Sequence, residues 1–329
     1  MNAQTARGRR LELAMRQLLL TRSGSARRRR GRVLSLLGSV LALAMVPAAA
    51  TAATPERGDR VETPVASSAP DSGVVTESYV RQYEPLPKAV GAPAACDWIG
   101  YLRYRIQKGP SDPSHAAAVL VAMPGFLGGA SPFDAVARNV IHMAALRGRY
   151  FELWALDRRA NCLEDHTGID AAARAHDYRV ALGYYYGGQE IHGRRFAGFL
   201  TSADVPYLAE FGLAQAMHDE YAVITRGMPD PAVRRRKVFC GGHSLGGSLT
   251  AAFASWDFQG DAGYNQCAGF FALDTTVSNN LGGGLKMGGL KGDALYSAET
   301  EGIRSGAVPR LAASAPPFTP ELFETVAFL

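Results

Sequence analysis

Short apolar runs separated by amphipathic stretches organise the chain after residue 115. Each run is continuous and bounded by Pro, Gly, Asp or charged residues, which is typical of a strand buried on both faces of a parallel sheet. The four runs span residues 116–123, 151–156, 238–242 and 268–273. They predict four buried strands.

Helices are expected between these strands. Ser131-Pro132-Phe133-Asp134 combines an N-cap residue with Pro and an acidic residue in the first turn, so a helix should begin there and end at Gly148. Further helices are expected over residues 206–226, where apolar side chains form one stripe, and over residues 245–258. Strands that alternate with helices predict an α/β fold in three layers with a mostly parallel sheet.

Three segments lack these patterns. Residues 53–92 are rich in Pro, Ser, Thr, Glu and Ala and are interpreted as a flexible, solvated linker, so the folded domain should span residues 93–329. Residues 167–204 add aromatic side chains to a polar stretch and are interpreted as a lid-like insertion. The four positive charges of residues 234–237 are interpreted as a solvated turn.

The first 52 residues have the order of an export signal. Ten arginines are followed by an apolar run over residues 33–46 and then by small residues ending in Ala50-Thr51-Ala52. The apolar run is shorter than the ~20 residues that span a bilayer, which disfavours a retained anchor. Cleavage near Ala52 and a secreted or cell-envelope protein without a stable membrane span are therefore expected.

The positive net charge belongs to this leader. The chain has 35 basic and 30 acidic residues, but residues 1–52 contain ten of the basic residues and one of the acidic ones. The remaining residues carry a net charge of about −4, so we expect no nucleic-acid partner. The full chain has 47% apolar and 20% charged residues, which is the composition of a globular domain.

Four cysteines lie in the part that would be exported. An even number in an oxidising compartment allows one or two disulfides. Three full pairings of Cys96, Cys162, Cys240 and Cys267 are open. Alternatively, Cys240 is only a small buried apolar residue, because it lies in an apolar run.

The sequence Gly242-His243-Ser244-Leu245-Gly246-Gly247 joins a predicted strand to a predicted helix. A nucleophile elbow needs this strand and helix, and it needs glycines such as Gly242 and Gly246 because the strained turn brings backbones close together. The N-terminus of the following helix would favour a developing oxyanion. In the alternative interpretation, Ser244 only caps the helix.

The loop Pro124-Gly125-Phe126 follows an earlier strand, where the second half of an oxyanion hole is expected. With the elbow, it makes residues 116–275 resemble the α/β-hydrolase superfamily, in particular its secreted bacterial lipase, esterase and cutinase-like members. The resemblance implies that Ser244 is the nucleophile and that the backbone N–H groups of Leu245 and Phe126 form the oxyanion hole. Residues 154–162 and 263–267 also resemble an uncharacterised group of exported hydrolases in that superfamily.

The chain departs from that family at two places. Pro124 stands where many relatives have His, and Cys240-Gly241 is less bulky than the usual entry to the elbow. In the family the catalytic acid and then the base follow the nucleophile along the chain. Asp274 follows the strand of residues 268–273 and is the candidate acid, although it could simply cap a turn.

No histidine follows Ser244, and the one beside it, His243, is expected to point away from the seryl oxygen. The seven histidines are His115, His142, His166, His176, His192, His218 and His243. Three explanations are open. The fold is incomplete at the C-terminus, with residues 280–329 beginning a second cap or insertion and the last strands missing; the protein is a non-catalytic binding protein derived from a hydrolase; or His166 supplies the base in a rewired triad.

The sequence therefore predicts a serine hydrolase of carboxylic esters that acts on a small-molecule or lipid ester. No phosphate-binding loop and no H-E-x-x-H motif occurs. Glu164-Asp165-His166 is interpreted as a polar turn, so neither a metal nor another cofactor is expected.

Overall fold

The computed structural model describes residues 54–126, 128–275 and 292–311. The predicted export signal lies outside these residues. So does most of the predicted cap at 280–329, whose described part contains α8 (Gly292–Ser305).

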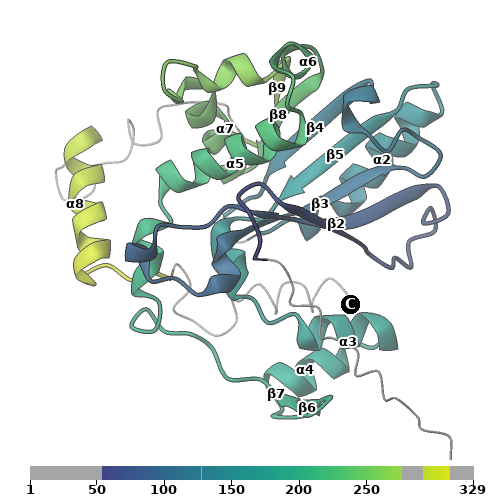
Figure 1. The fold of residues 1–329 in the computed structure, drawn as a ribbon. Coiled ribbons are helices and arrows are strands. Elements are labelled where there is room, and N and C mark those ends of the chain that lie inside the picture. The colour runs from purple at the N-terminus through teal and green to yellow at the C-terminus, as the bar shows by residue number, and fades with distance from the viewer. Residues whose placement is uncertain (1–53, 127, 276–291, 312–329) are drawn as a thin grey trace, which may run out of the picture. The chain divides into compact units, whose positions relative to one another are not determined.

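Seven strands form one sheet (Figure 1) in the order β1-β2-β3-β5-β4-β8-β9. Strands β5, β4, β8 and β9 are parallel, whereas β1, β2 and β3 are added to them antiparallel. The strands are β1 (Arg60–Pro64), β2 (Val75–Tyr83), β3 (Trp98–Ile106), β4 (Ala118–Met123), β5 (Phe151–Leu156), β8 (Val238–His243) and β9 (Gly269–Leu273). The four strands predicted from apolar runs are the four parallel ones.

Helices cover both faces of the sheet. On one face, α2 (Asp134–Ala145) packs against β3 and β5. On the other, α5 (Leu213–Gly227) packs against α7 (Leu245–Ser255), which lies on β8, β4 and β9. Alternate side chains of a strand point to opposite faces, so Val121 of β4 belongs to the core under α5 and α7, and Ala122 to the core under α2.

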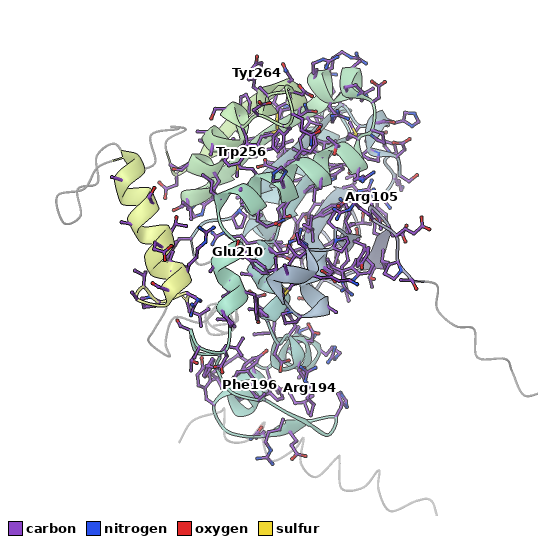
Figure 2. The ribbon with its side chains drawn as sticks, turned by 60° about the vertical axis from the view of Figure 1, so that its left-hand side comes forward. Arg105, Arg194, Phe196, Glu210, Trp256 and Tyr264 are labelled. Atoms are coloured by element: carbon purple, nitrogen blue, oxygen red, sulfur yellow. A yellow bond between two sulfur atoms is a disulfide. The ribbon has the colours of Figure 1, made fainter. Side chains whose placement is uncertain are left out.

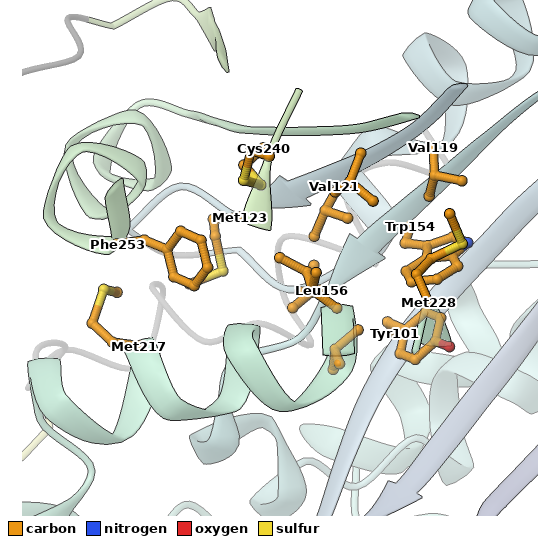
Figure 3. Close-up of a cluster of buried hydrophobic side chains, with 14 of the residues drawn as sticks. Tyr101, Val119, Val121, Met123, Trp154, Leu156, Met217, Met228, Cys240 and Phe253 are labelled. Carbon is orange, nitrogen blue, oxygen red and sulfur yellow. A yellow bond between two sulfur atoms is a disulfide. The ribbon is translucent and has the colours of Figure 1, made fainter. Parts of the chain in front are cut away.

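The larger core lies between the sheet and the two helices α5 and α7. Figure 3 shows Met217 and Phe253 from the helices facing Met123 and Leu156 from the strands. Trp154 and Tyr101 extend this core toward β3, with ring centroids 5.5 Å apart. This three-layer arrangement of helices around a mixed sheet, with a strand–serine–helix connection after β8, is the α/β-hydrolase fold.

The structure corrects the interpretation of residues 53–92 as a flexible linker. They contain β1 and β2, and nine residues of β2 pair with β3. Val75 and Val80 of β2 are buried, while every residue of β1 is exposed. The polar composition reflects an exposed edge of the sheet and not an absence of structure.

Two other predictions are corrected. Residues 234–237 end a helix, α6 (Pro231–Lys237), which Asp230 caps by accepting hydrogen bonds from the N–H groups of Ala232 and Val233. Arg234 is buried and donates to the carbonyls of Met228 and Pro229. The helix predicted over residues 206–226 is divided into a 3-10 helix and α5, which meet at Gly212.

Short 3-10 helices make many of the connections. They are η1 (Lys88–Val90), η2 (Ala94–Asp97), η3 (Pro113–His115), η4 (Ser131–Phe133), η5 (Arg159–Leu163), η6 (Pro206–Glu210) and η7 (Gly263–Gln266).

The predicted insertion at 167–204 contains its own small core. It comprises α3 (Thr167–Ala175), α4 (Arg179–Tyr185) and a hairpin of β6 (Glu190–Ile191) and β7 (Arg194–Arg195). Tyr184, Tyr185 and Phe196 contact one another through their rings, and Figure 2 labels Phe196 and Arg194 on this segment.

Two disulfides resolve the open cysteine pairings. Cys96 pairs with Cys162, with Cα atoms 5.0 Å apart, and Cys240 pairs with Cys267, with Cα atoms 6.0 Å apart. The first joins the segment before β3 to the segment after β5, and the second joins β8 to the start of β9. Among the described residues, no helix combines the length and apolar content that a membrane crossing requires.

Candidate active site

Ser244 occupies a strained turn between β8 and α7. Its backbone has φ 52° and ψ −119°, a conformation that costs a residue with a side chain about 1–3 kcal/mol. The Ser244 N–H donates to the Leu273 carbonyl at 3.1 Å, which ties the turn to the end of β9. The Ser244 hydroxyl makes no capping hydrogen bond to α7, so capping is not what this serine does in the structure.

The glycines on either side leave no room for side chains. A Cβ at Gly242 would lie 2.5 Å from the backbone carbon of Gly246, and a Cβ at Gly246 would lie 2.1 Å from the Met123 carbonyl oxygen. Gly247 differs from these two, because its Cβ would meet only the side chain of Thr275, with Cγ2 at 2.1 Å. The turn can therefore form only with glycine at positions 242 and 246, where the clash is with backbone.

Gly241 explains one departure from the family pattern. A Cβ at this position would lie 2.4 Å from Cγ of Phe271, because the Phe271 ring occupies the space beside β8. The small residue before the elbow thus accommodates a large side chain on β9.

The loop Pro124-Gly125-Phe126 lies against the elbow. A Cβ at Gly125 would be 3.5 Å from Cβ of Ser244 and 2.9 Å from Nδ1 of His243. The Phe126 side chain is 56% exposed. In the described part of the chain, the N–H groups of Phe126 and Leu245 donate no hydrogen bond.

Asp274 directly follows β9 at the same edge of the sheet as Ser244. In the parallel pairing, His243 is opposite Leu273, so Ser244 and Asp274 each directly follow one of the last two paired residues. Asp274 is exposed and has φ 49°. The candidate acid and the candidate nucleophile thus leave the sheet from neighbouring strands at the same edge.

Two histidines lie near this edge of the sheet. His243 is exposed, and its Nδ1 lies against Gly125, on the predicted oxyanion loop. His166 lies just before α3 and its Nε2 is 3.0 Å from Oε2 of Glu164. A histidine paired with a carboxylate is the arrangement of a triad base, although this pair follows β5, two strands from β8.

Glu164, Asp165 and His166 form the short loop between η5 and α3. Asp165 accepts a hydrogen bond from the Thr167 N–H at 3.0 Å and one from the Tyr184 hydroxyl at 2.9 Å. In residues 54–126, 128–275 and 292–311, no three His, Cys, Asp or Glu side chains are grouped closely enough to hold a metal ion.

Two residues after β5 were not assigned roles from the sequence. Asp157 is partly buried and accepts hydrogen bonds from the Ala130 N–H and the Tyr79 hydroxyl, both at 2.8 Å; loss of hydration raises its pKa to about 6. Arg158 donates from Nη1 to the Phe126 carbonyl at 2.7 Å and from Nη2 to the Pro124 carbonyl at 3.2 Å. Both residues thus hold the loop after β4, a contact between distant segments that no local motif indicates.

No protein-family model and no curated protein matches the chain. Among solved structures, the chain is similar to the S-formylglutathione hydrolase FrmB of Staphylococcus aureus, at 11% identity, over 78% of this chain and 74% of that chain, with a TM-score of 0.32. It is also similar to an acetyl xylan esterase from Paenibacillus sp. R4, at 16% identity over 61% and 51% of the two chains, with a TM-score of 0.29.

A bacterial heroin esterase is similar at 14% identity over 54% of this chain and 38% of that chain, with a TM-score of 0.27. The chain thus spans about half or less of the length of these two esterases. Similarity at this level adds nothing to the fold that the sheet topology already shows.

Proposed function

We propose that the protein is an exported serine hydrolase that cleaves carboxylic esters by acyl transfer to water. The observation that carries the proposal is the conformation of Ser244, whose positive φ at the junction of β8 and α7 is the turn of a nucleophile elbow. The N–H groups of Leu245 and Phe126, which donate no hydrogen bond to a described residue, and the position of Asp274 after β9, the strand paired with β8, support the same chemistry.

In the proposed reaction, Oγ of Ser244 attacks the ester carbonyl carbon while a base accepts the hydroxyl proton. The carbonyl oxygen becomes an oxyanion, which accepts hydrogen bonds from the N–H groups of Leu245 and Phe126. The alcohol leaves with a proton, and an acyl group remains on Ser244. Water then attacks the acyl-enzyme and releases the carboxylic acid.

The identity of the base is open within this proposal. The 329 residues contain no histidine after Ser244. His166, paired with Glu164, is the upstream candidate, since triads occur in more than one chain order.

Labelling with a fluorophosphonate tests the nucleophile. The full chain should react at Ser244, located by peptide mass spectrometry, and Ser244→Ala should not react. Ser248→Ala is the matched control, because Ser248 lies one turn further along α7 and should not affect labelling. Persistent labelling of Ser244→Ala would refute Ser244 as the nucleophile. Loss of labelling in His166→Ala, with the fold intact, would identify His166 as the base.

A second candidate function is binding without catalysis. In that case an ester ligand would bind equally well to the unchanged chain and to Ser244→Ala, and neither would hydrolyse it. Measurement of binding and of hydrolysis on the same two proteins separates the two functions.

Lipid esters are the substrate class that we favour. The insertion at 167–204 has apolar side chains that are more than one third exposed, namely Tyr186, Phe199 and Leu200, and the rings of Tyr186 and Phe199 are 5.6 Å apart. Such side chains would cover an acyl chain. Polyesters or esters of the cell envelope are the alternative substrates. Export is supported by the leader and by the two disulfides.

A further inference from the structure

Arg158 connects two loops at the edge of the sheet where Ser244 lies. It is the second residue after β5, and its side chain reaches the loop that follows the neighbouring strand β4. Nη1 donates to the Phe126 carbonyl at 2.7 Å and Nη2 to the Pro124 carbonyl at 3.2 Å. One guanidinium thus holds two carbonyls on either side of Gly125.

The carbonyl between them is held as well. The Gly125 carbonyl accepts a hydrogen bond from the Gly128 N–H at 3.2 Å. Because a peptide unit is planar, the Gly125 carbonyl and the Phe126 N–H are fixed together. The three consecutive carbonyls of Pro124, Gly125 and Phe126 therefore fix the direction of the Phe126 N–H, and two of the three are held by Arg158.

Arg158 has no competing partner among the described residues. No carboxylate lies within 4.0 Å of its guanidinium there, and its buried Nε has no hydrogen-bond partner. Burial lowers its pKa, as expected of a cation without a nearby anion. The hydrogen-bonding capacity of this side chain is thus directed at the loop carbonyls and not at an ion pair.

The backbone that carries Arg158 is itself fixed. The Arg158 N–H donates to Oδ1 of Asn161 at 2.8 Å, and Cys162 is joined to Cys96. The next residue, Arg159, is buried against Asp219 and donates to the carbonyls of Glu84 and Cys96. Because the backbone at Arg158 is held in place, its side chain can hold the loop. The contacts of Arg158 with the Pro124 and Phe126 carbonyls are called the brace below.

We propose that Arg158 is a positioning residue of the acyl-transfer site, and that its guanidinium holds the Pro124–Phe126 loop in the conformation that presents the Phe126 N–H to the oxyanion. This inference rests on the proposed function. It assigns to Arg158 no contact with the substrate.

Two variants and a matched control test it in the full chain. Arg158→Met keeps an apolar chain of similar length and removes the guanidinium. Arg158→Lys keeps the positive charge but not the two N–H groups that donate in parallel to the two carbonyls. Arg234→Met is the control, because Arg234 also donates to two backbone carbonyls, at 2.7 Å each, but does so before β8, at the opposite end of that strand from Ser244.

The first measurement is the second-order rate constant of fluorophosphonate labelling at Ser244 in folded protein. Arg158→Met should lower it by about ten- to a hundredfold, somewhat less than direct removal of an oxyanion-hole donor. Arg158→Lys should recover part of the loss, and so should methylguanidinium added to Arg158→Gly. Arg234→Met should label at the unchanged rate.

The second measurement does not depend on activity. Amide hydrogen exchange in the peptide that covers residues 124–130 should become faster in Arg158→Met and stay unchanged in Arg234→Met. If the unchanged chain does not label at all, the proposed function fails, while faster exchange in Arg158→Met still supports the brace. Unchanged exchange overturns the brace, and faster exchange with an unchanged labelling rate overturns its role in catalysis.

Discussion

Ser244 has a backbone conformation, and Glu220 has surroundings, that cost free energy. Ser244 has a positive φ, and the bond from its N–H to Leu273 together with the crowded glycines keeps it there. Glu220 of α5 is fully buried, and neither of its carboxyl oxygens has a hydrogen-bond partner among the described residues. The strain at Ser244 places its side chain at the N-terminus of α7, where the proposed oxyanion would form, whereas the buried Glu220 has no role in the proposed reaction.

Stability should therefore depend on pH through Glu220. Burial raises its pKa from 4.5 to about 8, so between these values the folded chain keeps a proton that the unfolded chain releases. Stability from this group is present below pH 4.5 and is lost as pH rises toward 8, by an order of 3–5 kcal/mol in total.

Glu220→Gln should remove this dependence. Its stability relative to the unchanged chain should increase from pH 5 to pH 8 in denaturant unfolding. Glu301→Gln, at an exposed position of α8, should show no such increase. A constant difference between Glu220→Gln and the unchanged chain across this range would contradict the assignment.

At the scale of elements, the sheet divides into strands that the sequence predicts and strands that it does not. The runs at β4, β5, β8 and β9 are apolar throughout, because a strand covered by helices on both faces has no polar side to show. In β3 the pattern is hidden by Arg103, which is buried and donates to Glu152 and Glu62. Pairing between distant segments makes this arginine compatible with the core, and local sequence carries no sign of the pairing.

The outermost strand should contribute little to stability. All residues of β1 are exposed, and its side-chain contacts are polar ones, such as that of Glu62 with Arg103. Deletion of residues 54–65 should therefore lower the free energy of unfolding by only about 1–2 kcal/mol, because the buried Arg103 keeps its hydrogen bonds to Glu152.

Removal of residues 54–84 should prevent folding, because it also removes β2. Val75 and Val80 are buried, and Glu77 and Asp71 pair with the buried Arg138 of α2. Circular dichroism and thermal unfolding of the two deletions provide the comparison. Equal losses in the two would show that β1 is not a dispensable edge.

For the molecule as a whole, the sequence predicts the layers and the turn that carries Ser244, but not the contacts that join distant parts. The N-terminal strands, the brace at Arg158 and the disulfide pairing depend on segments brought together by the fold. Four cysteines allow three full pairings, and only the sheet order shows that Cys240 of β8 lies beside Cys267.

Each disulfide should stabilise the whole domain. The pairs Cys240–Cys267 and Cys96–Cys162 close loops with separations of 27 and 66 residues, so loop entropy predicts losses of about 3–4 and about 4 kcal/mol when each pair is changed to Ala. Guanidinium unfolding of the two double variants measures these losses. The longer loop should matter at least as much as the shorter one, and the reverse order would show that packing around the cysteines dominates over loop entropy.

The crowding of the elbow also decides where the protein can be redesigned. Positions 242 and 246 admit no side chain because a Cβ there would clash with backbone, so libraries that vary them would yield mostly unfolded protein. Phe126 is more than half exposed and offers its backbone, not its ring, to the proposed reaction. An attempt to alter the range of accepted esters should therefore begin at position 126, where a new side chain changes the surroundings of Ser244 without entering the strained turn.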